Sequence, residues 1–436
     1  MRQPFLIVVS FLCLMAGPTI AIDLRADDVD DLVKRATTAW ESENFAQAAP
    51  LWQQIVDENP ESPQIAVALY RAGFSYMRLQ QYDKSIELLQ QSITKSSTED
   101  NQFVPEAYLY LGFAQSKVGE KFLELQQPQK ANQQLTTATE TFANLMARYS
   151  DFSENDQALF FQGDAFAALG RMEDAANSYS KMLKLKEDPE FKLAGLLALG
   201  SIRAQQGRFQ EAHEFFSAFE AEGQQDPAFP FAKFQNAHLL TELASASENR
   251  GDQGQANLLL GQAAEKLEAV YLSGQAGLSD KARFEQAKIL SRLQRYGESA
   301  EAFESVVQIS DSPLVDEARV YAGRDFMRSG NGNVAIQLLQ KSVSLDSAVS
   351  PLAAHWLSKF YLSAQQADRA YNVAEQWLVK TDDPSLKILL MRDKADAALE
   401  MPGKKTEAQQ LYVDIATQYP THPLAAVALY LSLIHI

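Results

Sequence analysis

The stretch LYRAGFSYMRLQQYDKSIELLQQSI, from Leu69 to Ile93, indicates the fold because its pattern recurs along the chain. A leucine is followed four residues later by glycine, and then come a short turn, an aromatic residue or methionine, a small residue and a large apolar residue. Residues 159–183 (LFFQGDAFAALGRMEDAANSYSKML) and 196–220 (LLALGSIRAQQGRFQEAHEFFSAFE) repeat this order in register. Self-similarity of this kind predicts a repeat architecture.

The same frame extends toward both ends of the chain. It fits residues 51–60, 284–307 and 320–343, and it begins again at His355. Within each half of a unit, apolar residues fall at i, i+3, i+4 and i+7, which is the pattern of an amphipathic helix. Each unit is therefore predicted to be a helix, a turn and a second helix, and the fold class is predicted to be all-α.

These residues resemble the tetratricopeptide repeat, whose period is about 34 residues. Small residues match the positions where the two helices of that repeat approach closely: Gly73, Gly112, Gly163, Gly200 and Gly323 on first helices, and Ala48, Ala175, Ala212, Ala335 and Ala370 on second helices. Pro60 and Pro420 match the closing proline of the repeat. The resemblance implies a right-handed α-solenoid of about ten helix-turn-helix units over residues 22–430.

Two units are longer than the repeat requires. The additional residues lie near 119–135 and near 245–256. One interpretation is tolerated insertion at loops, which repeat folds accept easily. The other is a pair of projecting hairpins that contact a partner, and the sequence leaves both interpretations open.

The first 21 residues, MRQPFLIVVSFLCLMAGPTIA, have the pattern of a secretory signal peptide. Arg2 supplies the positive charge, an apolar run follows, Gly17-Pro18 breaks it, and small residues end at Ala21. We expect cleavage after Ala21, with an uncleaved membrane anchor as the alternative. No later stretch is apolar enough to span a bilayer, so no integral span is expected in the mature chain.

Cleavage would also change the chemistry of the chain. It would remove Cys13, the one cysteine, so thiol catalysis, disulfide bonds and c-type haem attachment would be excluded from the mature protein. Removing Arg2 would leave 38 of the 39 basic residues against 56 acidic ones, a formal charge of −18. Nucleic acid and anionic lipid would repel such a chain at long range, so neither is expected as the main partner.

The last six residues, LSLIHI (431–436), do not continue the repeat. Val427-Ala428-Leu429-Tyr430 repeats Val67-Ala68-Leu69-Tyr70, but the Arg-Ala-Gly that follows Tyr70 has no counterpart after Tyr430. The hexapeptide resembles the translation of a transposon-end adapter used in DNA sequencing. We therefore expect residues 431–436 to be an artefact and the repeat array to be truncated at residue 430.

The sequence contains no convincing catalytic motif. The histidines lack the spacing that a zinc protease needs. Residues 330–335 satisfy the pattern G-x-G-x-x-A, but a predicted helix precedes them where a dinucleotide fold requires a strand. Gly403-Lys404-Lys405-Thr406 lacks the upstream glycine of a phosphate-binding loop. The sequence thus predicts no catalytic residue, no metal site and no cofactor.

The resemblance implies that the first helices line an inner groove and supply the ligand contacts. Carried over residue by residue, the candidate partner-binding positions are Tyr70, Phe74, Arg78, Lys117, Lys281, Phe284, Lys288, Arg292, Arg324, Met327, Arg328 and Lys359. One interpretation is ordinary solvated basic side chains. The other is a basic stripe that steers an acidic or C-terminal peptide, with Phe284 and Met327 as apolar anchors. The asparagine-rich carboxylate clamp of some family members is absent.

Together these features predict an exported protein-binding scaffold of the bacterial periplasm or cell envelope. The alternative is that the array forms the N-terminal interaction region of a larger envelope enzyme, whose catalytic domain would follow residue 430. The sequence does not indicate the partner protein or the oligomeric state.

Overall fold

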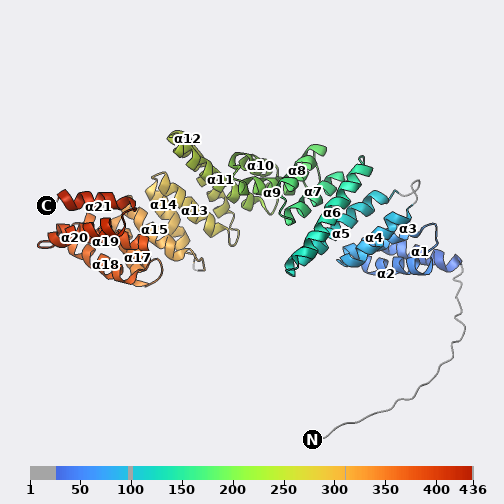
Figure 1. The fold of residues 1–436 in the computed structure, drawn as a ribbon, viewed down its shortest axis with the longest axis horizontal. Coiled ribbons are helices and arrows are strands. Elements are labelled where there is room, and N and C mark those ends of the chain that lie inside the picture. Colours follow the sequence, from blue (N-terminus) through green and yellow to red (C-terminus); the bar gives the residue numbers. More distant parts are fainter. Residues whose placement is uncertain (1–25, 97–101, 310, 435–436) are drawn as a thin grey trace, which may run out of the picture. The chain divides into compact units, whose positions relative to one another are not determined.

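The computed structural model describes residues 26–96, 102–309 and 311–434, and every regular element in those ranges is an α-helix (Figure 1). The all-α prediction is therefore confirmed for the described part of the chain. The expected signal peptide, residues 1–21, lies outside the described residues. No helix in the described ranges combines the length and the apolar character needed to cross a membrane.

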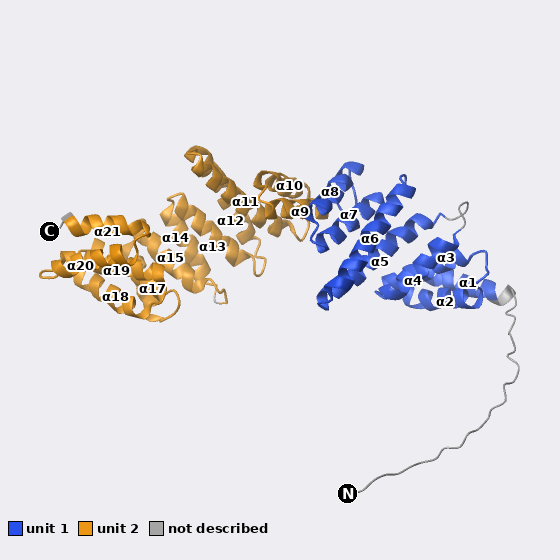
Figure 2. Cartoon of the chain, in the orientation of Figure 1, with its two compact units in different colours: residues 1–192 blue, residues 193–436 orange. Residues whose placement is uncertain are grey.

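The chain divides into two compact units, residues 1–192 and 193–436 (Figure 2). The helices of unit 1 are α1 (Ala26–Glu41), α2 (Phe45–Glu58), α3 (Ile65–Arg78), α4 (Tyr82–Lys95), α5 (Val104–Glu124), α6 (Pro128–Arg148), α7 (Asn155–Ala168) and α8 (Met172–Leu185). The helix α9 (Lys192–Gln205) begins at the boundary between the units.

The remaining helices of unit 2 are α10 (Phe209–Glu222), α11 (Phe229–Asn249), α12 (Gln253–Leu272), α13 (Ser279–Arg292), α14 (Tyr296–Val307), α15 (Val315–Arg328), α16 (Gly332–Ser344), α17 (Ser350–Ser363), α18 (Ala367–Lys380), α19 (Pro384–Glu400), α20 (Lys405–Gln418) and α21 (Pro423–Ile434). Odd-numbered helices are the first helices of the pairs, and even-numbered helices are the second ones. Within each unit, extensive packing joins helices that are next to each other or one helix apart in the sequence.

The two helices of a pair cross closely at the predicted glycines. A Cβ atom placed on Gly163 of α7 would lie 2.5 Å from Cε1 of Tyr179 on α8. On Gly200 of α9 it would lie 2.8 Å from Cε2 of Phe216 on α10. Both distances are far inside van der Waals contact, so the two positions require glycine, and the expectation of close crossings there is confirmed.

The turn between α15 and α16 accounts for the glycine-rich motif at residues 330–335. Gly330 has a φ of 87°, a left-handed conformation that an L side chain disfavours. The turn ends α15 at Arg328, and α16 begins at Gly332. The motif is thus a helix-to-helix turn, as its position after a predicted helix indicates.

The two long units contain longer helices. Helices α5, α6 and α11 have 21 residues each and α12 has 20, while the turns within these two pairs remain short, at residues 125–127 and 250–252. The additional residues therefore extend both helices of each hairpin and do not form inserted loops. Each long unit is therefore a hairpin of two long helices joined by a short turn.

Candidate partner-binding surface

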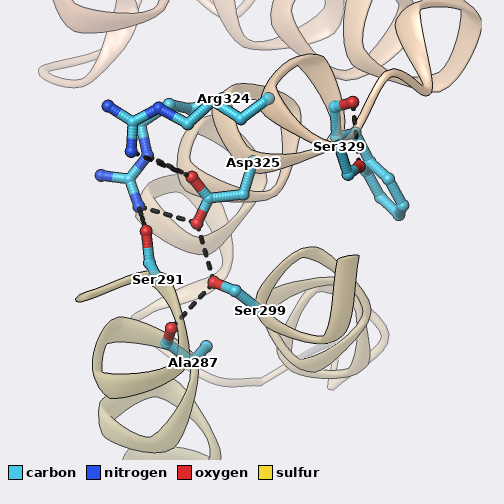
Figure 3. A network of polar contacts seen from close by, with 8 residues as sticks. Ala287, Ser291, Ser299, Arg324, Asp325 and Ser329 are labelled. Atoms are coloured by element: carbon cyan, nitrogen blue, oxygen red, sulfur yellow. Dashed lines mark hydrogen bonds and ion pairs between the residues drawn. The ribbon is translucent and has the colours of Figure 1, made fainter. Parts of the chain in front are cut away.

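A buried carboxylate organises the first helices in the middle of unit 2. Asp325 of α15 is fully buried. The guanidinium of Arg324 donates to both carboxylate oxygens, at 2.7 and 2.8 Å, and the Ser299 hydroxyl of α14 lies 2.7 Å from Oδ2 (Figure 3). Arg324 also donates to Ser291 Oγ of α13 at 2.8 Å. The carboxylate and its arginine thereby link three successive helices.

Two arginines of α15 contact one indole ring of α17. The guanidinium carbons of Arg324 and Arg328 lie 6.0 and 5.1 Å from the centroid of the Trp356 ring. Arg328 also lies over Tyr296, at 5.2 Å, and its Nη1 is 3.6 Å from Asp325 Oδ1. The rings and the buried acid hold both guanidinium groups in place, since cations are attracted to aromatic faces.

A second buried carboxylate lies under α17. Asp393 of α19 is fully buried, and its Oδ2 is 2.5 Å from Nδ1 of His355. Lys359 Nζ is 4.0 Å from Oδ1, which has no hydrogen-bond partner among the described residues. Burial raises the pKa of the Asp393 carboxyl, against the opposing effects of the hydrogen bond with His355 and the charge of Lys359.

We call Arg324, Arg328, Trp356 and Lys359 the first-helix surface. The side chains of its three cations are 16, 36 and 34% exposed, in the order Arg324, Arg328 and Lys359, whereas those of Asp325 and Asp393 are 0% exposed. The negative charges thus lie beneath the positive ones. The first-helix surface therefore presents cations to solvent on a chain whose formal charge is −17.

The predicted basic stripe does not continue onto α13. Lys288 pairs with Glu285 at 3.0 Å, and Arg292 pairs with Glu248 of α11 at 2.6 Å. These carboxylates are themselves 28 and 31% exposed, so they neutralise the cations at the surface. Lys281 is exposed at the start of α13. The expected continuous stripe is thus reduced to the cations around Trp356.

Three predicted apolar contacts are at least partly in the core. Tyr70 and Phe284 are buried, and Met327 is partly buried against the hydrophobic core of unit 2. The hydroxyl of Tyr70 donates to Glu106 of α5, and burial raises the pKa of Tyr70 above its usual value. The expectation that Phe284 anchors a ligand is wrong because its ring packs against Phe303 and Tyr321.

The other predicted residues of unit 1 lie near aromatic rings. Arg78 is exposed and lies 4.8 Å from the centroid of Phe45, and Phe74 is half-buried beside Tyr110. Lys117 pairs with Glu120 at 2.7 Å.

Lys117 and Glu120 also line a hollow of about 660 Å³ between the α3–α4 turn and the end of α5. Its charged lining residues are Lys84, Lys117, Lys121, Asp83, Glu120 and Glu124, so their charges balance.

No group of three or more potential metal ligands comes together in the described ranges.

A family model described as tetratricopeptide repeat matches residues 33–101 and 119–190, both within unit 1. The chain contains tetratricopeptide repeats. Tetratricopeptide repeats generally bind proteins and do not catalyse reactions, so this fold indicates a protein-interaction scaffold.

Similar solved structures are also tetratricopeptide repeat proteins. The C-terminal part of one from Cytophaga hutchinsonii is 14% identical, with 65% of this chain and 98% of that chain covered and a TM-score of 0.46. One from Parabacteroides merdae is 15% identical, with coverages of 64% and 98% and a TM-score of 0.39. A thermophilic one from Thermus thermophilus is 16% identical, with coverages of 49% and 98% and a TM-score of 0.34. No curated protein sequence matched this chain.

The tetratricopeptide frame contained a signal for the buried acid. Asp325 stands two residues after the crossing glycine Gly323, where other units have Ser75, Ala165 or Ile202. A carboxylate at a position that is otherwise small or apolar indicates a buried ion pair. Trp356 could not be found this way, because an aromatic residue on a first helix is more often part of the core.

Proposed function

We propose that this protein is an exported scaffold of the bacterial cell envelope that binds partner proteins through its first helices. The observation that carries the proposal is the first-helix surface, where Arg324 and Arg328 flank the partly exposed Trp356 over a buried carboxylate. Aromatic residues and arginine are the residue types that dominate binding energy at protein interfaces. The tetratricopeptide repeats in unit 1 support the same function.

Photo-crosslinking in cells tests the binding surface. A photoreactive amino acid replaces Lys359 on the first helix α17 and, as the matched control, Val379 on the second helix α18, which is 85% exposed. We expect discrete protein adducts from position 359, detected by mass spectrometry, and none of those adducts from position 379. Identical adducts from both positions, or adducts from position 379 alone, would contradict the proposed surface.

Export is supported by the pattern of the first 21 residues. We expect the protein purified from the envelope fraction of its bacterial source to begin at Ile22. N-terminal sequencing measures this directly, and a replacement of the apolar run by polar residues provides the control, because it should leave the protein in the cytoplasm. A purified protein that retains Met1 or Arg2 would contradict cleavage and support the anchored form.

A further inference from the structure

We propose that the first-helix surface recognises an internal acidic segment of a partner protein, with two side-chain carboxylates near one apolar side chain. This inference rests on the proposed protein-binding function and specifies the chemistry of the ligand. It depends on three properties of the surface: its charge, the placement of its cations on two helices, and the contacts that hold its arginines in position.

The charge of the surface selects an anionic ligand. Arg324 and Arg328 share the single carboxylate of Asp325, so this cluster carries one net positive charge. The carboxylate is fully buried, whereas Arg328 is 36% exposed, and the positive charge therefore lies on the solvent side. In contrast, the cations of α13 lie beside partly exposed glutamates, which reduce their attraction for an incoming acid.

The placement of the cations on two helices favours two carboxylates over one. Arg328 ends α15, and Lys359 lies on α17, one turn after Trp356. A segment that places carboxylates on both helices engages both cations, and an apolar side chain near them can contact the indole. A chain terminus supplies a single carboxylate. The two-helix arrangement thus favours internal glutamate or aspartate residues.

The arginines are held in position before a ligand binds. Arg324 makes three hydrogen bonds to Asp325 and Ser291, and Arg328 packs on Tyr296 and Trp356. Exposed ion pairs contribute little when two long side chains must be ordered to form them. Here that ordering is already supplied by the fold, which lowers the entropic cost of binding. Asp325 acts as a positioning residue, because it fixes the arginines without facing the ligand.

Fluorescence anisotropy with defined peptides tests the ligand class. The probes are labelled, acetylated and amidated decapeptides with two glutamates separated by two to five residues and one phenylalanine between them. The comparison peptides replace glutamate by glutamine, and one of these has a free C-terminal carboxylate. We expect at least one acidic peptide to bind the full chain tenfold or more tightly than its glutamine analogue, with affinity that falls as salt rises.

Charge-removing variants locate the binding. The double variant Arg328→Gln/Lys359→Gln should weaken the acidic peptide about tenfold, as expected for the loss of two charge contacts. The matched control Lys341→Gln/Lys405→Gln removes two exposed lysines from the second helices α16 and α20 and should leave the affinity unchanged. Arg328→Lys keeps the charge and should retain most of the binding, which guards against misfolding as the explanation of any loss.

Three outcomes would overturn the inference. The first is that acidic peptides bind no more tightly than their glutamine analogues, or that no peptide binds. The second is that the double variant binds the acidic peptide as tightly as the wild type. The third is that the glutamine peptide with a free C-terminus binds as tightly as the acidic peptide. The crosslinking result separates this failure from that of the proposed function. If adducts form at position 359 while acidic peptides are not preferred, the scaffold function stands and the acidic ligand is wrong.

Discussion

Replacing Asp325 with alanine is expected to lower the free energy of unfolding of unit 2 by about 3 kcal/mol. The substitution leaves the Arg324 guanidinium mostly buried without its carboxylate, and it removes one of the two acceptors of the Ser299 hydroxyl, the other being the Ala287 carbonyl oxygen. Breaking one side of a buried ion pair typically costs about 3–5 kcal/mol, and the partial exposure of Arg324 places this case at the lower end. Guanidinium denaturation followed by circular dichroism measures the change.

Two further variants make the Asp325 result specific. Asp325→Asn keeps the shape and one acceptor oxygen, so its effect should be smaller than that of alanine. The control Asp382→Ala removes a fully exposed carboxylate that lies 3.8 Å from Lys387, and it should leave the free energy of unfolding nearly unchanged. A loss for Asp325→Ala no larger than this control would show that the buried acid does not stabilise the first helices.

Gly163→Leu is expected to destabilise unit 1 by about 1–3 kcal/mol or more, because it overpacks the crossing of α7 and α8. Tyr179, which the new side chain would meet, is buried, and its hydroxyl donates to Asp164 Oδ1 at 2.5 Å. The ring therefore cannot move aside without breaking that hydrogen bond. Hydrogen exchange measured by mass spectrometry should show the largest loss of protection in α7 and α8, with smaller losses in the adjacent helices of unit 1.

The same substitution at a glycine without a close neighbour is the control. Gly261 lies inside α12, and a Cβ atom there would meet no atom within 4 Å. Gly261→Leu should be neutral or slightly stabilising, because leucine has a higher helix propensity than glycine. Equal destabilisation by both substitutions, or uniform loss of protection throughout unit 1 after Gly163→Leu, would contradict a crossing-specific effect.

The sequence predicted the helix pairs well because their determinants are local. The spacing from Gly163 to Tyr179 reflects a contact between two consecutive helices, and the same spacing recurs from Gly200 to Phe216. The sequence indicated two long units by their length and left open whether the additional residues form loops. Residues 119–135 are rich in glutamine, lysine, glutamate and leucine, which have high helix propensities. The structure extends α5 and α6 into this stretch, and α11 and α12 into residues 245–256, leaving only the short turns between them.

The candidate site was predicted only in part, because helical position does not determine burial or pairing. Phe284 and Lys288 are one turn apart on α13, yet one is in the core and the other is exposed. Arg292 and Arg328 occupy similar places at the ends of first helices, but Arg292 meets a partly exposed glutamate and Arg328 a buried aspartate. Such differences depend on side chains from neighbouring units, which one repeat's pattern does not contain.

The packing of each helix on its near neighbours in the sequence also has a consequence for how the chain acquires its structure. Extensive packing within each unit joins helices that are adjacent or one apart, and in the described ranges it requires no pairing of distant strands. Chains dominated by such local contacts form them quickly, because little loop-closure entropy opposes each one. Within each unit, helix pairs can therefore fold in order as they emerge from the ribosome, each on the pair that precedes it in that unit.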